Sequence, residues 1–201
     1  MEVAVGYISY MITVIYNFKG GEGKTKIATN LALTMKHAIV TNDVYSPIDK
    51  IFPSEKILKL YPKDEIPDFD ANDDIVFDLG GYADARVISV LKKAKYIIIP
   101  ITNEEDNIEV AIGAIDEIGK HNKNIIIIVN KSTGNDFNEV SEDLGKIYNY
   151  PIFEIKKSRV VRRLTSEGKS IRELANQGGL FKYNYSKIAD QFDELINFIT
   201  Q

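Results

Sequence analysis

Residues 16–25 of this sequence read Tyr16-Asn17-Phe18-Lys19-Gly20-Gly21-Glu22-Gly23-Lys24-Thr25. An apolar run at 12–15 precedes this stretch, and a segment with helical spacing of apolar residues follows it at 27–33. A strand, a glycine-rich loop and a helix, in that order, are the context of a phosphate-binding loop. Backbone N–H groups of such a loop and the helix dipole attract an anion. Lys24 can reach the outer phosphates, and the Thr25 hydroxyl suits Mg²⁺.

Composition narrows the class of protein. The chain has 201 residues, of which 44% are hydrophobic and 27% charged, so it fits one globular domain. Its net charge of -4 gives no overall attraction to nucleic acid or anionic lipid, so any such surface must be local. The absence of cysteine excludes disulfides, thiolate metal sites and a cysteine nucleophile.

Targeting signals are also not expected. No run approaches about 18 apolar residues, and residues 1–10 lack the basic start of a secretory signal. We therefore expect a cytoplasmic protein. Residues 1–10 are expected to be an N-terminal extension without an assigned role, and residues 11–201 a single domain.

Apolar runs alternate with helical patterns along most of the chain. Strands are expected at 12–16, 38–41, 75–78, 96–101, 124–130 and 152–155. Helices are expected at 24–36, 84–93, 105–121, 137–148 and 186–199. Strands that are continuously apolar favour a parallel sheet covered on both faces. Right-handed crossovers then predict an α/β doubly wound fold, a mostly parallel sheet flanked by helices.

Residues 42–72 form the least regular part of the sequence. This segment contains four prolines and one plausible short helix at 54–60. A connection of this length is more often functional or mobile than idle. The alternative is a long surface connection without a role.

The phosphate loop departs from the strict pattern G-x-x-x-x-G-K-[ST], whose first glycine would fall at Phe18. The variant K-G-G-x-G-K-T, with Lys19 in front, resembles the deviant loop of the ParA/MinD family of ATPases. This resemblance implies a P-loop NTPase fold with ATP and Mg²⁺ as cofactors. It also implies that the nucleotide contacts Lys19, Gly20, Gly21, Glu22, Gly23, Lys24, Thr25 and Lys26.

Two acids are candidates for the chemistry. Asp78 closes an apolar run and precedes Gly80-Gly81, as in a Walker-B arrangement, so it can hold Mg²⁺ through a water beside Thr25. Relatives carry Asp-x-Asp after the second strand, and its first acid positions the attacking water. Two registers are open here. Asp43 matches the first acid, or Thr41 and Asp43 match the pair, in which case the water-positioning acid is missing and hydrolysis would be slow or absent.

Lys19 and Asn130 also take roles from the resemblance. In the family, the signature lysine reaches across a dimer interface to the partner's nucleotide, where a cation can neutralise charge on the transferred phosphoryl group. The resemblance therefore implies a homodimer that forms on ATP binding. Asn130 ends an apolar run, and its amide can pair with the adenine edge or cap the next turn.

Positive charge concentrates at residues 156–164, and Lys169, Arg172 and Lys182 extend it. Such a local surface suits DNA phosphates bound without sequence specificity. Alternatively, it is a solvated helix face whose apolar residues Val160, Val161 and Leu164 point inward. The candidate DNA contacts are Arg159, Arg162, Arg163 and Lys169.

The last helix has an apolar stripe, but its polar face holds Asp190, Asp193 and Glu194. MinD-like relatives end in a basic amphipathic helix that binds membrane. Anionic lipid would repel these three acids, so we expect core packing and no membrane partner.

The resemblance implies a ParA-type ATPase for plasmid or chromosome partition. An ATP-dependent dimer would bind nonspecific DNA on the nucleoid, and hydrolysis, stimulated by a ParB-like or small DNA-binding partner, would reset it. The alternative is a nucleotide-gated scaffold that hydrolyses little. A metabolic ligase with the same loop has less reason to carry Lys19.

Overall fold

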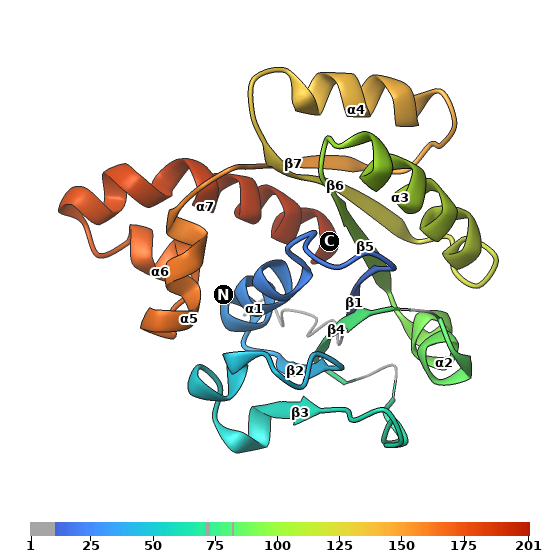
Figure 1. Ribbon diagram of the computed structural model, residues 1–201. Coiled ribbons are helices and arrows are strands. Elements are labelled where there is room, and N and C mark those ends of the chain that lie inside the picture. Colours follow the sequence, from blue (N-terminus) through green and yellow to red (C-terminus); the bar gives the residue numbers. More distant parts are fainter. Residues whose placement is uncertain (1–10, 71–72, 82) are drawn as a thin grey trace, which may run out of the picture.

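A seven-stranded parallel sheet forms the centre of the molecule (Figure 1). The computed structural model describes residues 11–70, 73–81 and 83–201, without the side chains of Glu105, Arg162 and Thr165. The N-terminal extension expected at 1–10 lies outside this range. Within it, the strands lie in the order β3 (Ile57–Lys59), β2 (Ala38–Thr41), β4 (Ile75–Gly80), β1 (Ile12–Asn17), β5 (Tyr96–Ile101), β6 (Ile125–Ser132) and β7 (Ile152–Lys156).

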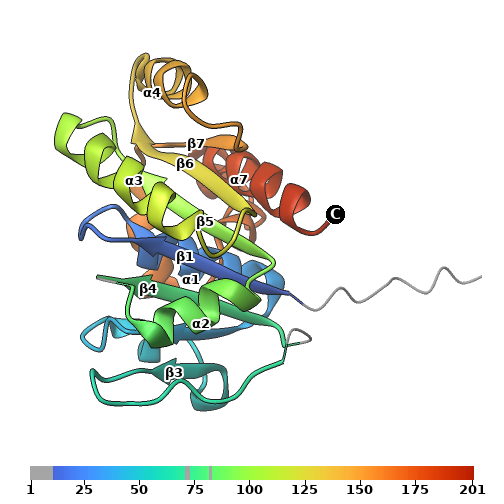
Figure 2. The same ribbon diagram turned by 90° about the vertical axis from the view of Figure 1, so that its right-hand side faces the viewer.

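Helices cover both faces of this sheet (Figure 2). One layer contains α1 (Lys24–Met35), α5 (Leu164–Glu167), α6 (Ile171–Ala175) and α7 (Gly179–Ile199). The other contains α2 (Ala85–Lys93), α3 (Glu105–Ile118) and α4 (Asp136–Gly145). Successive strand residues enter opposite layers: Ile97 and Ile127 pack in one, and Ile98 and Ile128 in the other. This two-sided burial is why the strands are continuously apolar, and the predicted α/β doubly wound fold is confirmed.

The crossovers change face at the centre of the sheet. Helix α1, which leads from β1 to β2, lies in one layer, whereas α2, which leads from β4 to β5, lies in the other. In an open parallel sheet, ligands bind beyond the carboxyl ends of the strands at such a switch point. The glycine-rich loop follows β1, and Gly81 follows β4, so both lie at this point.

Several boundaries differ from the prediction, among them the following three. The helix expected at 54–60 is wrong: residues 54–56 form a 3₁₀ turn, and β3 then pairs with β2, whose edge would otherwise be open. Strand β4 continues to Gly80 because β1 pairs with it as far as Asn17, so Asp78 lies within the strand. The last helix begins at Gly179 rather than at residue 186, directly after Gly178 in a positive-φ conformation.

The apolar stripe of α7 lies in the core, as expected. Tyr185, Ile188, Phe192, Leu195 and Ile199 are buried against the sheet and its neighbouring helices. Across residues 11–70, 73–81 and 83–201, no helix combines the length and the apolar character needed to cross a bilayer.

The two-layer core predicts a large contrast between two isoleucines. Ile127 is 0% exposed in β6, whereas Ile147 is 58% exposed beyond α4. We expect Ile127→Ala to lower the free energy of unfolding by about 2–5 kcal/mol, because it removes apolar contacts and leaves a cavity. Ile147→Ala should change it by less than about 0.5 kcal/mol. Urea unfolding followed by circular dichroism measures both, and equal losses would contradict this core.

Candidate nucleotide-binding site

Residues 18–23 form the glycine-rich loop between β1 and α1. Gly21 and Gly23 have φ angles of 85° and 86°, which side chains rarely tolerate. A Cβ atom on Gly23 would also lie 2.5 Å from the Asn130 amide nitrogen. Gly23 is the N-cap of α1, so the first N–H groups of the helix lie beside the loop. The loop therefore needs glycine at two positions for conformation and, at Gly23, for space as well.

A cavity of about 480 Å³ borders this loop, the start of α1 and the ends of β2 and β4. Eight predicted site residues line it, four of which carry the side chains expected to bind Mg²⁺, phosphate or water: Lys24, Thr25, Asp43 and Asp78. The remaining lining residues are Phe18, Gly20, Gly21, Gly23, Lys26, Asn42, Gly80 and Gly81. Lys19, Glu22 and Asn130 are not among them.

Asp78 places a carboxylate inside the sheet, where it is only 2% exposed. Burial raises its pKa, while hydrogen bonds from the Thr25 and Thr41 hydroxyls and the charge of Lys24 act in the opposite direction. The Thr41 Oγ1 donates to Asp78 Oδ2 over 3.1 Å. The hydroxyl of Thr25 and the carboxylate of Asp78 thus lie side by side, a pair of hard oxygen ligands of the kind that Mg²⁺ prefers.

Lys24 extends along the same cavity. Its Nζ donates to the Lys19 carbonyl over 2.7 Å. A Cβ atom on Gly80 would lie 3.1 Å from that Nζ, so glycine at this position leaves room for the lysine. Burial lowers the pKa of Lys24, and the negative charge of Asp78 is the first of the influences that oppose it. The ammonium group is therefore held between the loop and the end of β4.

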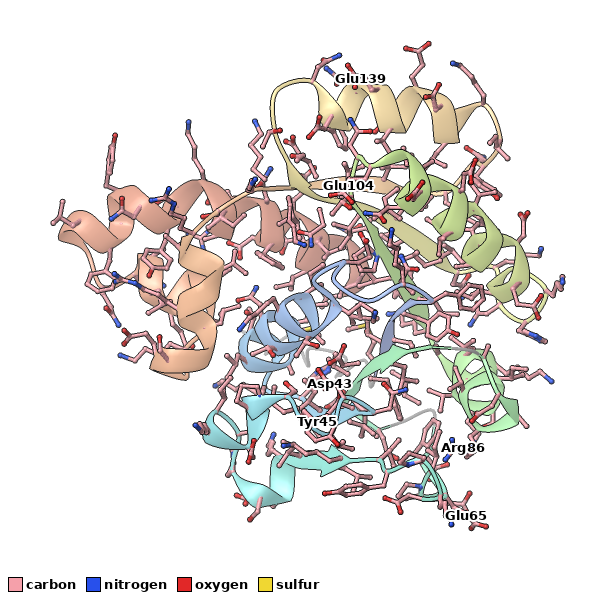
Figure 3. The ribbon with its side chains drawn as sticks, in the orientation of Figure 1. Asp43, Tyr45, Glu65, Arg86, Glu104 and Glu139 are labelled. Atoms are coloured by element: carbon pink, nitrogen blue, oxygen red, sulfur yellow. The ribbon has the colours of Figure 1, made fainter. Side chains whose placement is uncertain are left out.

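The ends of β2 and β4 are tied together by polar groups. The N–H of Asp43 donates to Thr41 Oγ1 over 3.0 Å, so one hydroxyl connects Asp43 with Asp78. The Asn42 side chain donates to the Gly80 carbonyl over 2.8 Å and accepts from the Gly80 N–H over 3.1 Å. The Asp43 side chain is exposed, and Figure 3 shows it beside Tyr45 beyond the end of β2. Asn42 was not predicted as a site residue, because its position after a strand is a weak signal on its own.

Asn130 contacts the loop rather than the next turn. Its Nδ2 donates to the Glu22 carbonyl over 2.6 Å. A smaller cavity of about 180 Å³ lies beside it, with Ile27, Ile155 and Phe192 among its apolar lining residues. The position suits a flat aromatic base, and the contact with adenine stays a prediction.

Glu22 turns away from the nucleotide cavity. It is 2% exposed, and burial raises its pKa against a hydrogen bond with Thr102 and the positive charges of Lys131 and Lys19. Thr102 lies at the carboxyl end of β5 and also accepts a hydrogen bond from Asn107. The acid of the loop is therefore anchored in the neighbouring β5–α3 connection.

The basic segment presents arginines outward. Arg159, Arg163 and Lys169 are exposed, whereas Leu164 is buried and Val160 and Val161 pack against the core. The side chain of Arg162 lies outside the described residues. Arg172 does not extend the surface, because its Nη2 lies 2.6 Å from a carboxylate oxygen of Asp190 and 2.6 Å from one of Asp193.

Comparison with known families agrees with this site. The model of the CobQ/CobB/MinD/ParA nucleotide binding domain matches residues 13–171. The match covers well over half of the chain, and the protein therefore belongs to this family of nucleotide-binding domains. A comparison with curated protein sequences gave no match.

Solved structures share the fold at low sequence identity. A candidate plasmid partition protein from Borrelia burgdorferi B31, bound to AMPPNP, is 16% identical with a TM-score of 0.64, over 92% of this chain and 98% of that one. An ATP complex of a McdA variant from Cyanothece is 13% identical with a TM-score of 0.62, over 92% and 95%. MinD from Pyrococcus horikoshii OT3, with Mg-ADP, is 17% identical with a TM-score of 0.61, over 94% and 98%.

The raised pKa of Asp78 predicts a distinctive pH dependence. The folded protein keeps the proton to higher pH than the unfolded chain, so stability falls as pH rises from 3.8 through the raised pKa. Asp78→Asn removes this penalty. We expect the Tm of the nucleotide-free variant to exceed that of the wild type near neutral pH, with the difference shrinking toward about pH 4.

Thermal melts across this pH range measure the difference. Asp84→Asn is the control, and its effect on Tm should have the opposite sign. The hydrogen bond from Arg86 lowers the pKa of Asp84, so ionised Asp84 stabilises the fold at neutral pH and this stabilisation is lost on acidification. An Asp78→Asn effect that does not vary with pH would contradict the burial argument.

Proposed function

We propose that this protein is a ParA-type ATPase that dimerises on binding ATP, binds DNA without sequence specificity and serves plasmid or chromosome partition. The observation that carries the proposal is the gathering of Lys24, Thr25, Asp43 and Asp78 on one cavity beside the glycine-rich loop. The relatives bound to AMPPNP, ATP and Mg-ADP support ATP and Mg²⁺ as the ligands here.

The residues on the cavity define separate tasks in ATP binding and hydrolysis. Loop N–H groups and Lys24 would hold the phosphates, and Thr25 and Asp78, the latter through a water, would hold Mg²⁺. The bound cation supplies charge neutralisation on the phosphate oxygens. Within the described residues, no three or more histidine or acidic side chains are grouped to hold a metal ion. A Mg²⁺ ion at this site would therefore take some of its ligands from the phosphates of the nucleotide.

Asp43 is proposed to orient the attacking water. Its carboxylate borders the cavity on the open side, where it can accept a hydrogen bond from water positioned against the γ-phosphate. Attack by that water would form a new P–O bond, break the bond between the γ-phosphorus and the oxygen that stays with ADP, and pass the water's proton to the phosphate product. The Thr41 hydroxyl, bonded to both Asp78 and the Asp43 N–H, sets the distance between the two acids.

Lys19 is proposed to act across a dimer. Its carbonyl accepts the Lys24 hydrogen bond, and its side chain is half-buried near the carboxylate of Glu22. A lysine supplied by a second subunit would screen the triphosphate and stabilise charge during transfer. Dimerisation would then depend on ATP.

The exposed basic segment is proposed to bind DNA. Arg159, Arg163 and Lys169 lie outside the nucleotide cavity, so phosphate contacts there leave the ATP site free. A ParB-like or small DNA-binding partner would stimulate turnover, and the complex would associate with the nucleoid.

The alternative is a nucleotide-gated scaffold with little hydrolysis. It follows from the second register, in which Thr41 and Asp43 match the pair of acids in relatives, so that a hydroxyl replaces the water-positioning acid. ATP-dependent dimerisation with turnover at background, in the presence of DNA and partner, would support this alternative.

The dimer proposal is tested at Lys19. Lys19→Ala should bind ATP with nearly wild-type affinity but stay monomeric with ATP and Mg²⁺, because the triphosphates lose their screening charge. Size-exclusion chromatography with light scattering measures the mass with ATP and with ADP. Lys50→Ala removes an exposed lysine outside the phosphate loop; this variant is the control and should dimerise. A wild-type protein that stays monomeric with ATP would refute the proposal.

The DNA surface is tested with matched charge removal. The triple variant Arg159→Ala, Arg163→Ala and Lys169→Ala should bind random duplex DNA weakly, and the slope of log affinity against log salt should fall by about 3. The control removes three exposed lysines elsewhere, at Lys63, Lys92 and Lys123, and reaches the same net charge. Fluorescence anisotropy measures the DNA affinity of both variants. Equal losses of affinity would show that net charge alone, and not this surface, determines DNA binding.

A further inference from the structure

Lys131 occupies an unusual backbone position at the end of β6. The pairing of β6 with β7 passes from Asn130 opposite Ile155 to Ser132 opposite Lys156, so Lys131 is the extra residue of a bulge. Its φ angle is 56°, in the left-handed region that disfavours residues with a side chain. Lys36, at the end of α1, is the other described non-glycine residue with positive φ. Such strain persists where surrounding contacts compensate for it.

The compensating contact at Lys131 is with the phosphate loop. Its Nζ donates to the Gly21 carbonyl over 2.6 Å, and the Asn130 amide donates to the next carbonyl, that of Glu22, over 2.6 Å. Without the bulge, the alternation of a strand would place these two side chains on opposite faces. The bulge therefore lets two adjacent residues of β6 hold two consecutive carbonyls of one loop.

Holding these carbonyls also orients the N–H groups of the loop. In a trans peptide the C=O and N–H point in opposite directions, and the described residues contain no cis bond. The N–H groups of Glu22 and Gly23 therefore point away from β6. Gly21 and Gly23, both with positive φ, flank Glu22, and successive N–H groups in such a turn form a concave anion site.

The loop also contains an acid that would repel phosphate. Glu22 is buried, and its Oε2 has no hydrogen-bond partner among the described residues. The positive charges of Lys131 and Lys19 both act to lower the pKa of Glu22, against the effect of its burial. Lys131 therefore acts on the loop in two ways. It orients the peptide groups of the loop, and its positive charge offsets the negative charge of the Glu22 carboxylate.

We propose that Lys131 is a positioning residue for nucleotide binding, which holds the Gly21 carbonyl from outside so that the N–H groups of Glu22 and Gly23 are preorganised for phosphate. This inference rests on nucleotide binding by the loop. ATP and ADP would both bind through this loop, so removal of the Lys131 ammonium group should weaken the binding of both nucleotides. Relief of the backbone strain alone should weaken the binding of neither.

Two glycine substitutions separate these effects. Lys131→Gly keeps the left-handed backbone, which glycine adopts freely, and removes the ammonium. Lys36→Gly relieves the same strain at a position whose side chain does not touch the loop. We expect Lys131→Gly to raise the Kd for both ATP and ADP by roughly tenfold or more, the loss typical of a charged hydrogen bond. Lys36→Gly should leave both Kd values unchanged, and neither variant should lower the Tm of the nucleotide-free protein.

Lys131→Arg and Lys131→Met complete the test. Arginine keeps a cation that can reach the Gly21 carbonyl and should restore most of the affinity, whereas methionine, of similar length and no charge, should not. Isothermal titration with ATP and with ADP, each with Mg²⁺, measures the Kd values. Wild-type affinity in Lys131→Gly would overturn the inference alone. A wild-type protein that binds neither nucleotide would overturn the proposed function and the inference together.

Discussion

The carboxylate of Asp78 lies within the central sheet, where an ionised group is unstable unless neighbouring groups compensate for its lost hydration. Compensation comes from three residues on two elements: Thr41 at the end of β2, and Thr25 and the charged Lys24 at the start of α1. Their convergence on β4 sets the position of the phosphate loop relative to both strand ends. The compensation is incomplete, since the pKa of Asp78 stays raised, and a bound cation would complete it. A buried acid with a raised pKa lowers the stability of the ligand-free fold near neutral pH, as is typical of functional sites.

Around this centre, the loops are held mainly by side chains from neighbouring strand ends. Asn42 binds both backbone groups of Gly80, and Asn130 and Lys131 bind consecutive carbonyls of the phosphate loop. Glycine-rich segments have little conformational preference of their own, so they need such external contacts to present a defined anion site. The rigidity of the site thus comes from the sheet, whose strand ends carry these polar groups.

The same fold occurs in structures of differently named proteins, among them a candidate plasmid partition protein, McdA and MinD. Features outside the phosphate loop therefore have to distinguish this chain. Arg172 is neutralised by two aspartates, the stripe of α7 is buried, and Arg159, Arg163 and Lys169 stay exposed. These features of the chain favour a DNA surface over a membrane surface in the proposed function.

The amino-acid sequence by itself determined the parallel sheet, most helix positions and the glycine-rich loop. These features depend on near neighbours: continuous apolar runs for strands buried on both faces, and glycines with Lys24 and Thr25 for a phosphate site. It did not determine β3, because a three-residue edge strand forms only where β2 offers an open edge. The sequence also predicted that the strand ends at Asp78. In the structure, β4 continues to Gly80 because β1 pairs with it that far.

Only the tertiary structure decided which polar groups meet. Asn42 and Gly80 are 38 residues apart, and Lys131 and Gly21 are 110 apart, so no local pattern joins them. The bulge that turns Lys131 toward the loop arises from the pairing of β6 with β7. The sequence motif predicts that the glycine-rich loop binds a phosphate. The packing of distant strand ends decides how the loop is held to bind it, because those hydrogen bonds exist only once the sheet has formed.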